Sequence, residues 1–408
     1  MNTAAHACGR PGLAAPLRRS SRGVTLIELM VSIAIGLFIV IAVASVMVTQ
    51  EGIRRNATTG SDATANAAVA SLLLERSIKN GGYGMNSAVP GGLMDVCTPQ
   101  GLSAKNSARA TPDFSFAAYE FAPVVINPSS IPAGDTNTHV IRVTYSGNQI
   151  FGAAALNAIA VSPVRVPTRA GLNTGDLVVL GQASNACIFR QITALPNNLR
   201  CSTPADLANS DVVQFADASY KSDYAACADT AQRWNGDGTF GTVTFVPTTS
   251  LAAGLRLYDL GPADRFQSVI YAVRKGTLVM CNFMTQPCEN AAKVNDATVW
   301  QQLVDDVVSL RAEYGIDGND DNVIDSWTTV TPAAMVGGWN GTTAIRIAVT
   351  TRAKNYEKDE VIVDTGAGKN SPVWVGGDIN VSHIADWKHY RYTVNQNTIV
   401  LKNAFWRD

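Results

Sequence analysis

The stretch Arg22-Gly23-Val24-Thr25-Leu26-Ile27-Glu28-Leu29-Met30 decides the fold of the N-terminal part of this 408-residue chain. It leads into an apolar run, Leu29 to Val48, that contains no charged residue. Because an α-helix rises about 1.5 Å per residue, this run spans roughly the hydrocarbon core of a bilayer. Glu28 lies just at its start, where lipid makes a charge costly. Residues 24–48 are therefore predicted to form the transmembrane half of a long N-terminal helix.

A basic leader, a glycine, the Thr-Leu-Ile-Glu-Leu core and an uninterrupted apolar helix together resemble the class III signal of type IV prepilins and pseudopilins. The resemblance implies that residues 1–23 are a leader peptide. A prepilin peptidase of the inner membrane would cut between Gly23 and Val24 and methylate the new N-terminus. Val24 departs from the family, which usually has phenylalanine at this position. A rival reading is an ordinary secretory signal cut after Ala42-Val43-Ala44.

Glu28 would be the fifth residue of the mature chain. In an assembly of staggered helices, its carboxylate can meet the N-terminal amine of a neighbouring subunit, and a buried charge is tolerated when it is paired. We therefore expect Glu28 to fix the register of subunits during assembly. The alternative is a glutamate at the membrane interface of an ordinary anchor.

The distribution of charge indicates in which cellular compartment each part of the chain lies. The leader holds four arginines and no acid, and its removal leaves 28 basic and 33 acidic residues. Positive charge stays cytoplasmic, so the chain after Val48 is predicted to be periplasmic before assembly into a fibre. The mature chain lacks the basic excess typical of nucleic-acid binding.

Six cysteines remain after Cys8 leaves with the leader, an even number in an oxidising compartment. Short separations favour pairing Cys281 with Cys288 and Cys187 with Cys201, which leaves Cys97 with Cys227. The alternative is that these are free buried thiols.

Residues 49–82 continue the helix as its periplasmic half. The pattern places Ala65, Val69, Leu72 and Leu73 on one face, predicts a Glu75–Lys79 pair, and predicts a stop at Asn80-Gly81-Gly82. The run Leu74–Met85 and the ending Thr398–Asn403 resemble PilW-type minor pilins.

The resemblance implies an α+β fold of the pilin-like lollipop kind, with one long helix packed on an antiparallel β-sheet. Residues 85–260 are predicted to be a large loop- and strand-rich insertion or lobe, with strands at residues 140–145, 177–180 and 242–246 and a short helix at residues 153–160. Residues 265–408 are predicted to be the core antiparallel sheet, with a hairpin turn at Lys275-Gly276.

Residues 317–325 form the stretch with the clearest chemistry. Oxygen ligands fall at the spacing of a calcium loop, namely Asp317, Asn319, Asp321, the carbonyl of Val323, and Asp325. Asn322 replaces the turn glycine, and Thr328 stands where a bidentate glutamate belongs. Calcium is thus the one cofactor that the sequence suggests. The alternative is a solvated Asp/Asn turn.

No enzyme motif is present, and the glycine pattern at residues 236–241 lacks the flanking strand and helix of a dinucleotide site. The resemblance implies a minor pilin that joins a complex priming type IV pilus assembly and sits at the pilus tip, with no catalytic activity. Its implied partners are the prepilin peptidase, other minor pilins, the major pilin and a tip adhesin. The alternatives are a minor pseudopilin of type II secretion and a secreted or membrane-anchored enzyme.

Overall fold

The computed structural model describes 17 segments of the chain, which together hold all the elements named below: residues 23–85, 93–97, 102–105, 113–116, 121–147, 155–157, 160–161, 164–181, 187–196, 201, 211–215, 219–231, 234–235, 255–319, 321–332, 338–366 and 369–403. The chain divides into two compact units, Met1–Ala57 and Thr58–Asp408. Each unit is described by itself.

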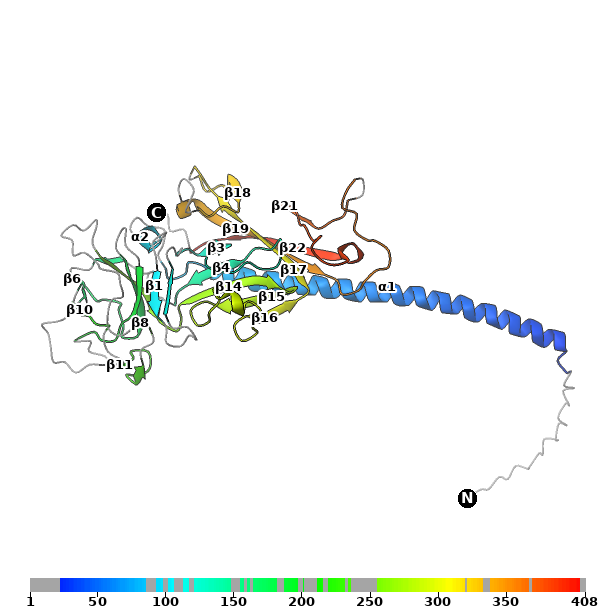
Figure 1. Ribbon diagram of the computed structural model, residues 1–408, viewed down its shortest axis with the longest axis horizontal. Coiled ribbons are helices and arrows are strands. Elements are labelled where there is room, and N and C mark those ends of the chain that lie inside the picture. Colours follow the sequence, from blue (N-terminus) through cyan, green and yellow to red (C-terminus); the bar gives the residue numbers. More distant parts are fainter. Residues whose placement is uncertain are drawn as a thin grey trace, which may run out of the picture. The chain divides into compact units, whose positions relative to one another are not determined.

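Helix α1 (Leu26–Asn80) is continuous, as the sequence predicts (Figure 1). Its first part belongs to the first unit, where apolar side chains such as Phe38 and Val48 are about three-quarters exposed. The glycines at 36, 52 and 60 do not interrupt it. Among the described residues, α1 is the one helix long and apolar enough to cross a membrane.

The C-terminal end of α1 follows local sequence signals. The helix ends at Asn80, and Gly82 has a positive φ of 79° that glycine adopts without strain. The Gly82 amide donates to the Thr144 carbonyl at 2.8 Å, which ties this turn to a strand. The predicted pair of Lys79 with Glu75 is present.

The face of α1 that the second unit buries differs from the predicted one. Ala63, Ala67, Ala70, Leu74 and Ile78 are fully or almost fully buried. Val69 and Leu72, which the sequence pattern placed with the core, are about half exposed. Small side chains on the buried face let the helix approach closely, and the Thr351 hydroxyl reaches the Ala63 carbonyl at 2.8 Å.

Two antiparallel sheets carry the main core together with α1. The first has the strand order β16-β15-β14-β4-β3, and the second has the order β18-β17-β19-β22. Their bounds are β3 (Val124–Ile126), β4 (Ile141–Tyr145), β14 (Gln267–Arg274), β15 (Thr277–Asn282), β16 (Gln301–Asp305), β17 (Val307–Ile316), β18 (Ser326–Thr328), β19 (Thr342–Arg352) and β22 (Tyr392–Val400).

The β14–β15 hairpin turns at Lys275-Gly276, as predicted. Both residues have positive φ, 51° and 72°, which is the pattern of a type I′ turn. The Asp135 carboxylate accepts hydrogen bonds from both amides, at 3.0 and 2.9 Å. A residue 140 positions away thus fixes the turn.

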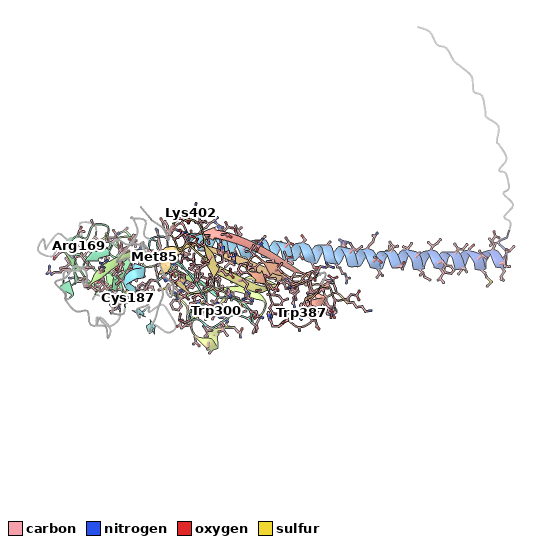
Figure 2. All side chains as sticks on the ribbon, turned by 90° about the horizontal axis from the view of Figure 1, so that it is seen from above. Met85, Arg169, Cys187, Trp300, Trp387 and Lys402 are labelled. Atoms are coloured by element: carbon pink, nitrogen blue, oxygen red, sulfur yellow. A yellow bond between two sulfur atoms is a disulfide. The ribbon has the colours of Figure 1, made fainter. Side chains whose placement is uncertain are left out.

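A third sheet, of order β2-β1-β9-β8-β13-β5, lies at the other end of the second unit (Figure 1). Figure 2 labels Cys187 and Arg169 in this region and Trp300 and Trp387 in the region of the first two sheets. The strands are β1 (Leu102–Lys105), β2 (Asp113–Phe116), β5 (Ala155–Asn157), β8 (Asp176–Gly181), β9 (Cys187–Gln191) and β13 (Arg256–Pro262).

Smaller elements complete the second unit. They are α2 (Leu93–Cys97), β6 (Ala160–Val161), β7 (Val164–Arg165), β10 (Val212–Val213), β11 (Ser219–Lys221), β12 (Asp229–Ala231), β20 (Val373–Trp374), β21 (Gly377–Asp378), and 3-10 turns at Ala291–Lys293, Gly338–Gly341 and Trp387–His389. The segment with β20 and β21 covers the outer face of the β17–β19 sheet with Trp374, Ile379 and Val381.

The predicted boundary between an insertion at residues 85–260 and a core sheet at residues 265–408 does not match the observed sheets. Strand β4, from the predicted insertion, pairs with β14, and β3, from the same segment, pairs with β4. Residues 265–408 supply strands to three sheets instead of one, namely the two larger sheets and the small β20–β21 sheet. Residues 155–157 are a strand, so the short helix predicted there is wrong, whereas the predicted strand at residues 242–246 lies outside the described residues.

Candidate functional site

The predicted processing site lies directly before α1. Thr25 caps the helix, because its hydroxyl accepts from the Glu28 amide at 3.3 Å and its carbonyl accepts from the Leu29 amide at 3.0 Å. Gly23 and Val24 are exposed and precede the helix. A β-carbon added at Gly23 would meet nothing within 4 Å. The folded chain therefore sets no steric requirement for glycine here, and a requirement would come from a processing enzyme.

Glu28 is exposed in the first turn of α1. Thr25 and Glu28 have the spacing of a capping box, and a carboxylate in the first turn also favours the helix dipole. Sequence reasoning missed this capping role, although the Thr-x-x-Glu signal is in the quoted stretch. The helix dipole favours an acid near the helix start, but it does not by itself account for one beside an apolar run.

Polar side chains within the apolar helix are satisfied by the helix itself. The hydroxyl of Ser32 donates to the Glu28 carbonyl at 2.7 Å, and the Ser45 hydroxyl donates to the Ala42 carbonyl at 2.8 Å. Such local bonds leave no unpaired hydroxyl to face lipid. Residues 42–45, the rival cleavage site, lie inside α1.

The predicted calcium ligands are on one loop but mostly bind backbone amides. Asp317, which is buried, accepts from the Asn322 amide at 2.9 Å, and Asp325 accepts from the Gly318 amide at 2.7 Å. The Asn319 side chain donates to the Asp321 carboxylate at 3.1 Å.

Two further features of this loop concern its ability to bind calcium. Asn322 adopts a positive φ of 66° at the position where a calcium loop usually has glycine. Within the described residues, no group of three His, Cys, Asp or Glu side chains is arranged to hold a metal ion.

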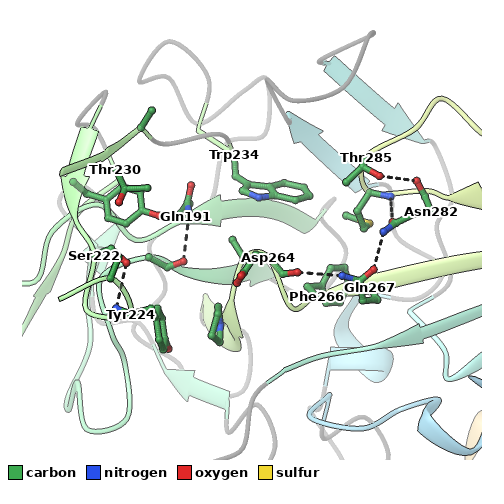
Figure 3. A pocket seen from close by; sticks show the side chains of 17 residues that line it. Gln191, Ser222, Tyr224, Thr230, Trp234, Asp264, Phe266, Gln267, Asn282 and Thr285 are labelled. Carbon is green, nitrogen blue, oxygen red and sulfur yellow. Dashed lines mark hydrogen bonds between the residues drawn. The ribbon is translucent and has the colours of Figure 1, made fainter. Parts of the chain in front are cut away.

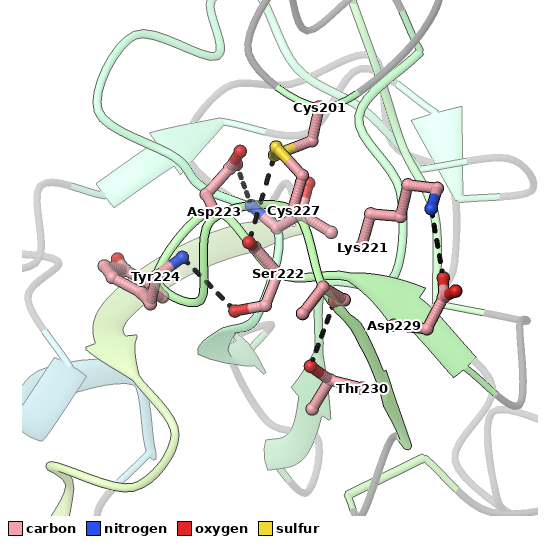
Figure 4. The surroundings of a disulfide bond; sticks show 10 residues. Cys201, Lys221, Ser222, Asp223, Tyr224, Cys227, Asp229 and Thr230 are labelled. Carbon is pink, nitrogen blue, oxygen red and sulfur yellow. Dashed lines mark hydrogen bonds and ion pairs between the residues drawn. A yellow bond between two sulfur atoms is a disulfide. The ribbon is translucent and has the colours of Figure 1, made fainter.

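The cysteines pair differently from the sequence expectation. Disulfides join Cys97 to Cys187, Cys201 to Cys227, and Cys281 to Cys288. Only the third pair was predicted. Cys187 begins β9, which pairs in parallel with β1, and this arrangement brings the end of α2 to the start of β9. Figure 4 shows the surroundings of the Cys201–Cys227 bond, in the turn after β11.

Two of the described histidines pack against neighbouring residues of the second unit. Burial, followed by the charge of Arg311, lowers the pKa of His139 to about 4. Its ring contacts the Ala312 backbone, so His139 packs against β17 as a neutral structural residue. His389 stacks on Tyr356 with ring centroids 4.8 Å apart. The glycine pattern at residues 236–241 lies outside the described residues.

Comparison with known proteins gives two matches. The family model of the type IV pilus-assembly protein W, PilW, matches residues 270–403, which run from β14 to just beyond β22. The model of the prokaryotic N-terminal methylation motif matches residues 18–44. Neither a search of curated proteins nor a search of solved structures found a match.

These matches support a pilin-like function in pilus assembly. The family is a structural component of pili and is not an enzyme family. The methylation motif implies processing by a peptidase and interaction with other pilins, and the apolar helix fits a membrane-anchored pilin. The matches at residues 18–44 and 270–403 agree with the resemblance to PilW-type minor pilins.

Proposed function

We propose that this chain is a minor pilin that joins a complex of minor pilins, primes assembly of a type IV pilus and lies at the pilus tip. Before assembly it is held in the inner membrane by residues 24–48, with the remainder of the chain in the periplasm. It acts by association with other minor pilins, the major pilin and a tip adhesin. The N-terminus carries this proposal, because an exposed glycine precedes a capped helix that has an acid in its first turn and then the uncharged apolar run of residues 29–48.

The processing step is tested by Gly23→Leu. The peptidase must approach the backbone closely at this position, and glycine alone has no side chain. We expect the variant to accumulate as a precursor with its leader attached. Ala44→Leu is the matched control at the rival cleavage site and should mature normally. N-terminal sequencing of the mature chain should begin at Val24, and a start at Ser45 or normal processing of Gly23→Leu would contradict the proposal.

The assembly step is tested by Glu28→Ala. The variant should be processed normally but should enter sheared pili in lower amount, because the amine of a neighbouring subunit loses its partner. Glu51→Ala is the matched control, since Glu51 lies on the same helix, is exposed and pairs with Arg55 at 3.0 Å. Equal amounts of both variants in sheared pili would exclude a register role for Glu28.

Deletion of the gene separates the proposal from its alternatives. Loss of pili and of twitching supports a minor pilin. Loss of exoprotein secretion with normal pili would indicate a minor pseudopilin of type II secretion. Normal pili and normal secretion would favour a secreted or anchored enzyme.

We also propose that the loop at residues 317–325 binds calcium weakly. The positive φ of Asn322 supplies the backbone turn that such a loop needs, and Asp321 is exposed beside Asn319. A bound divalent cation would relieve the repulsion among the carboxylates of Asp317, Asp321 and Asp325.

A further inference from the structure

A cavity of about 430 Å³ lies between the third sheet and the β14–β15 hairpin (Figure 3). Gln191 of β9 lines one side, and the β11–β12 hairpin contributes Tyr220 and Tyr224. Asn282, at the end of β15, lines the opposite side. The cavity has the size of a small-molecule site.

The charge of the lining limits the class of ligand. Among the described lining residues there is one carboxylate, Asp264, and there is no lysine, arginine or histidine. A phosphate or another anion would find no cationic partner here. The other polar groups are amides and hydroxyls, which suit a ligand that offers both donors and acceptors.

Four aromatic rings, together with alanines, Pro262 and Met284, form the apolar part of the lining. Trp234 and Phe266 both pack on Phe189, with ring centroids 5.8 and 5.4 Å away, so their positions are fixed by the core. Tyr220 is held by the Gln191 side chain, which donates to its hydroxyl at 3.0 Å.

Tyr224 differs from these rings because it is 47% exposed. Its hydroxyl donates to the buried Asp176 and accepts from the Asn173 side chain at 3.1 Å. With its hydroxyl engaged on the side away from solvent, Tyr224 presents its ring as a rigid apolar surface at the cavity.

The amides at the opposite side are oriented before any ligand arrives. Asn282 donates to the Gln267 side chain at 2.7 Å and accepts from the Met284 amide at 3.0 Å. Gln267 donates to the Asp264 carbonyl at 3.1 Å. Each of these side-chain amides uses one of its two hydrogens in these bonds, which leaves one for a ligand. Groups fixed in this way lose little freedom on binding.

We propose that this cavity binds a neutral sugar residue, with one face of the sugar ring against Tyr224 and its hydroxyls on Gln267 and Asn282. A pyranose combines an apolar C–H face with a rim of hydroxyls, so it matches both halves of the lining. Aromatic faces carry partial negative charge and attract polarised C–H groups. The proposal does not depend on the role of the chain in pilus assembly.

A quaternary ammonium ligand is the main competitor, because aromatic rings with one carboxylate also suit such cations. The two classes differ in their dependence on Asp264. Asp264 is exposed, so Asp264→Asn removes its charge without disturbing the core. Sugar binding should change by less than about threefold in this variant, whereas cation binding should fall at least about tenfold.

The experiment uses the full chain in a detergent without a sugar or choline head group. Binding is measured by saturation-transfer NMR and tryptophan fluorescence with glucose, galactose, mannose, N-acetylglucosamine and their β-linked dimers, and with tetramethylammonium. We expect at least one sugar to bind and Tyr224→Ala to weaken it by about tenfold or more.

Tyr224→Phe is the matched control, because it removes the same bond to Asp176 but keeps the ring. It should bind within about threefold of the unaltered chain, so that the difference between the two variants reports the ring alone. Tyr356→Ala, at a similarly exposed tyrosine elsewhere, should have no effect. No binding by any sugar of the panel, equal binding by Tyr224→Ala and Tyr224→Phe, or binding of tetramethylammonium alone would each overturn the proposal.

Discussion

The disulfide between Cys97 and Cys187 is expected to contribute more to stability than the other two. It closes the longest loop, with a sequence separation of 90, against 26 for Cys201–Cys227 and 7 for Cys281–Cys288. If a disulfide acts by restricting the unfolded chain, these loops correspond to about 4.6, 3.6 and 2.5 kcal/mol respectively. Because Cys97 and Cys187 are fully buried, alanine is the replacement that adds no buried polar group.

The assay compares three double variants of the fragment 58–408, which contains the complete second unit. Each variant replaces one bonded pair by alanines, and urea unfolding is followed by tryptophan fluorescence. The free energy of unfolding should fall most for Cys97→Ala/Cys187→Ala and least for Cys281→Ala/Cys288→Ala. The reverse order would refute the argument from loop length.

A thiol count in denaturant tests the pairing itself. Cys97→Ala/Cys187→Ala should contain no free thiol, because both partners leave together. Cys187→Ala/Cys201→Ala should contain two, from Cys97 and Cys227. Two free thiols in Cys97→Ala/Cys187→Ala and none in Cys187→Ala/Cys201→Ala would instead indicate bonds between Cys187 and Cys201 and between Cys97 and Cys227. That result would refute the observed connectivity.

Three further predictions concern the helix, the buried acids and the calcium loop. Leu74→Ala should reduce the free energy of unfolding by about 2–5 kcal/mol, whereas Leu72→Ala, on the exposed face, should change it by about 0.5 kcal/mol or less in the same urea assay; equal losses would contradict the observed face. Burial, together with the charge of Asp176, raises the pKa of Asp259 well above its ordinary value, and burial raises that of Asp176 to about 6. The folded state then holds protons that the unfolded chain releases near pH 4. The free energy of unfolding should therefore fall as pH rises from about 4 through the raised pKa values of the folded state. Asp259→Asn should reduce that fall between pH 5 and 8, and an unchanged pH slope would count against it. Calcium at 10 mM should stabilise the fragment by roughly 1.4–2.7 kcal/mol if the dissociation constant is on the order of 10⁻⁴–10⁻³ M, and Asp317→Ala/Asp321→Ala should abolish the effect. Equal melting temperatures in calcium and in chelator would reduce the loop to an acidic turn.

Local signals in the sequence predicted the features that depend on neighbouring residues. Helix α1 ends at Asn80 because Gly81 and Gly82 follow, and the β14–β15 hairpin turns at Lys275-Gly276 because these two residues accept positive φ. The strand predicted at residues 140–145 is likewise present, as β4. In each case the deciding interactions lie within a few residues of one another.

Features that depend on distant segments were not predictable in this way. The separation argument for Cys187 and Cys201 failed because β1 pairs in parallel with β9 and carries the region of Cys97 to the start of β9. The predicted division of the second unit failed because β4 pairs with β14, more than 100 residues away. Asp135, which caps the hairpin turn, gives no signal in the sequence for the same reason.

The buried face of α1 shows how packing can override a hydrophobic pattern. Val69 and Leu72 are larger and more apolar than Ala63, Ala67 and Ala70, yet the alanines face the sheet. A helix that carries alanine at the contact can lie close enough for the Thr351 side chain to bond to its backbone. Burial of this face is therefore set by the fit of two surfaces, which a count of apolar residues on one of them does not capture.

The sequence of strand β8 indicates that both of its faces are buried. Residues 177–180 are all apolar, which is typical of a strand buried on both faces. In the structure, Leu177 and Val179 join the main core, while Val178 and Leu180 join a second core with Ile188 and Leu257. A sheet packed on both faces moves little, and it is this sheet that positions Gln191 and Phe189. Phe189 lies on β9, which pairs with β8, and its ring packs on both Trp234 and Phe266. The fixed positions of these two cavity rings therefore follow from the apolar run of β8, which lies 50 to 90 residues earlier in the chain.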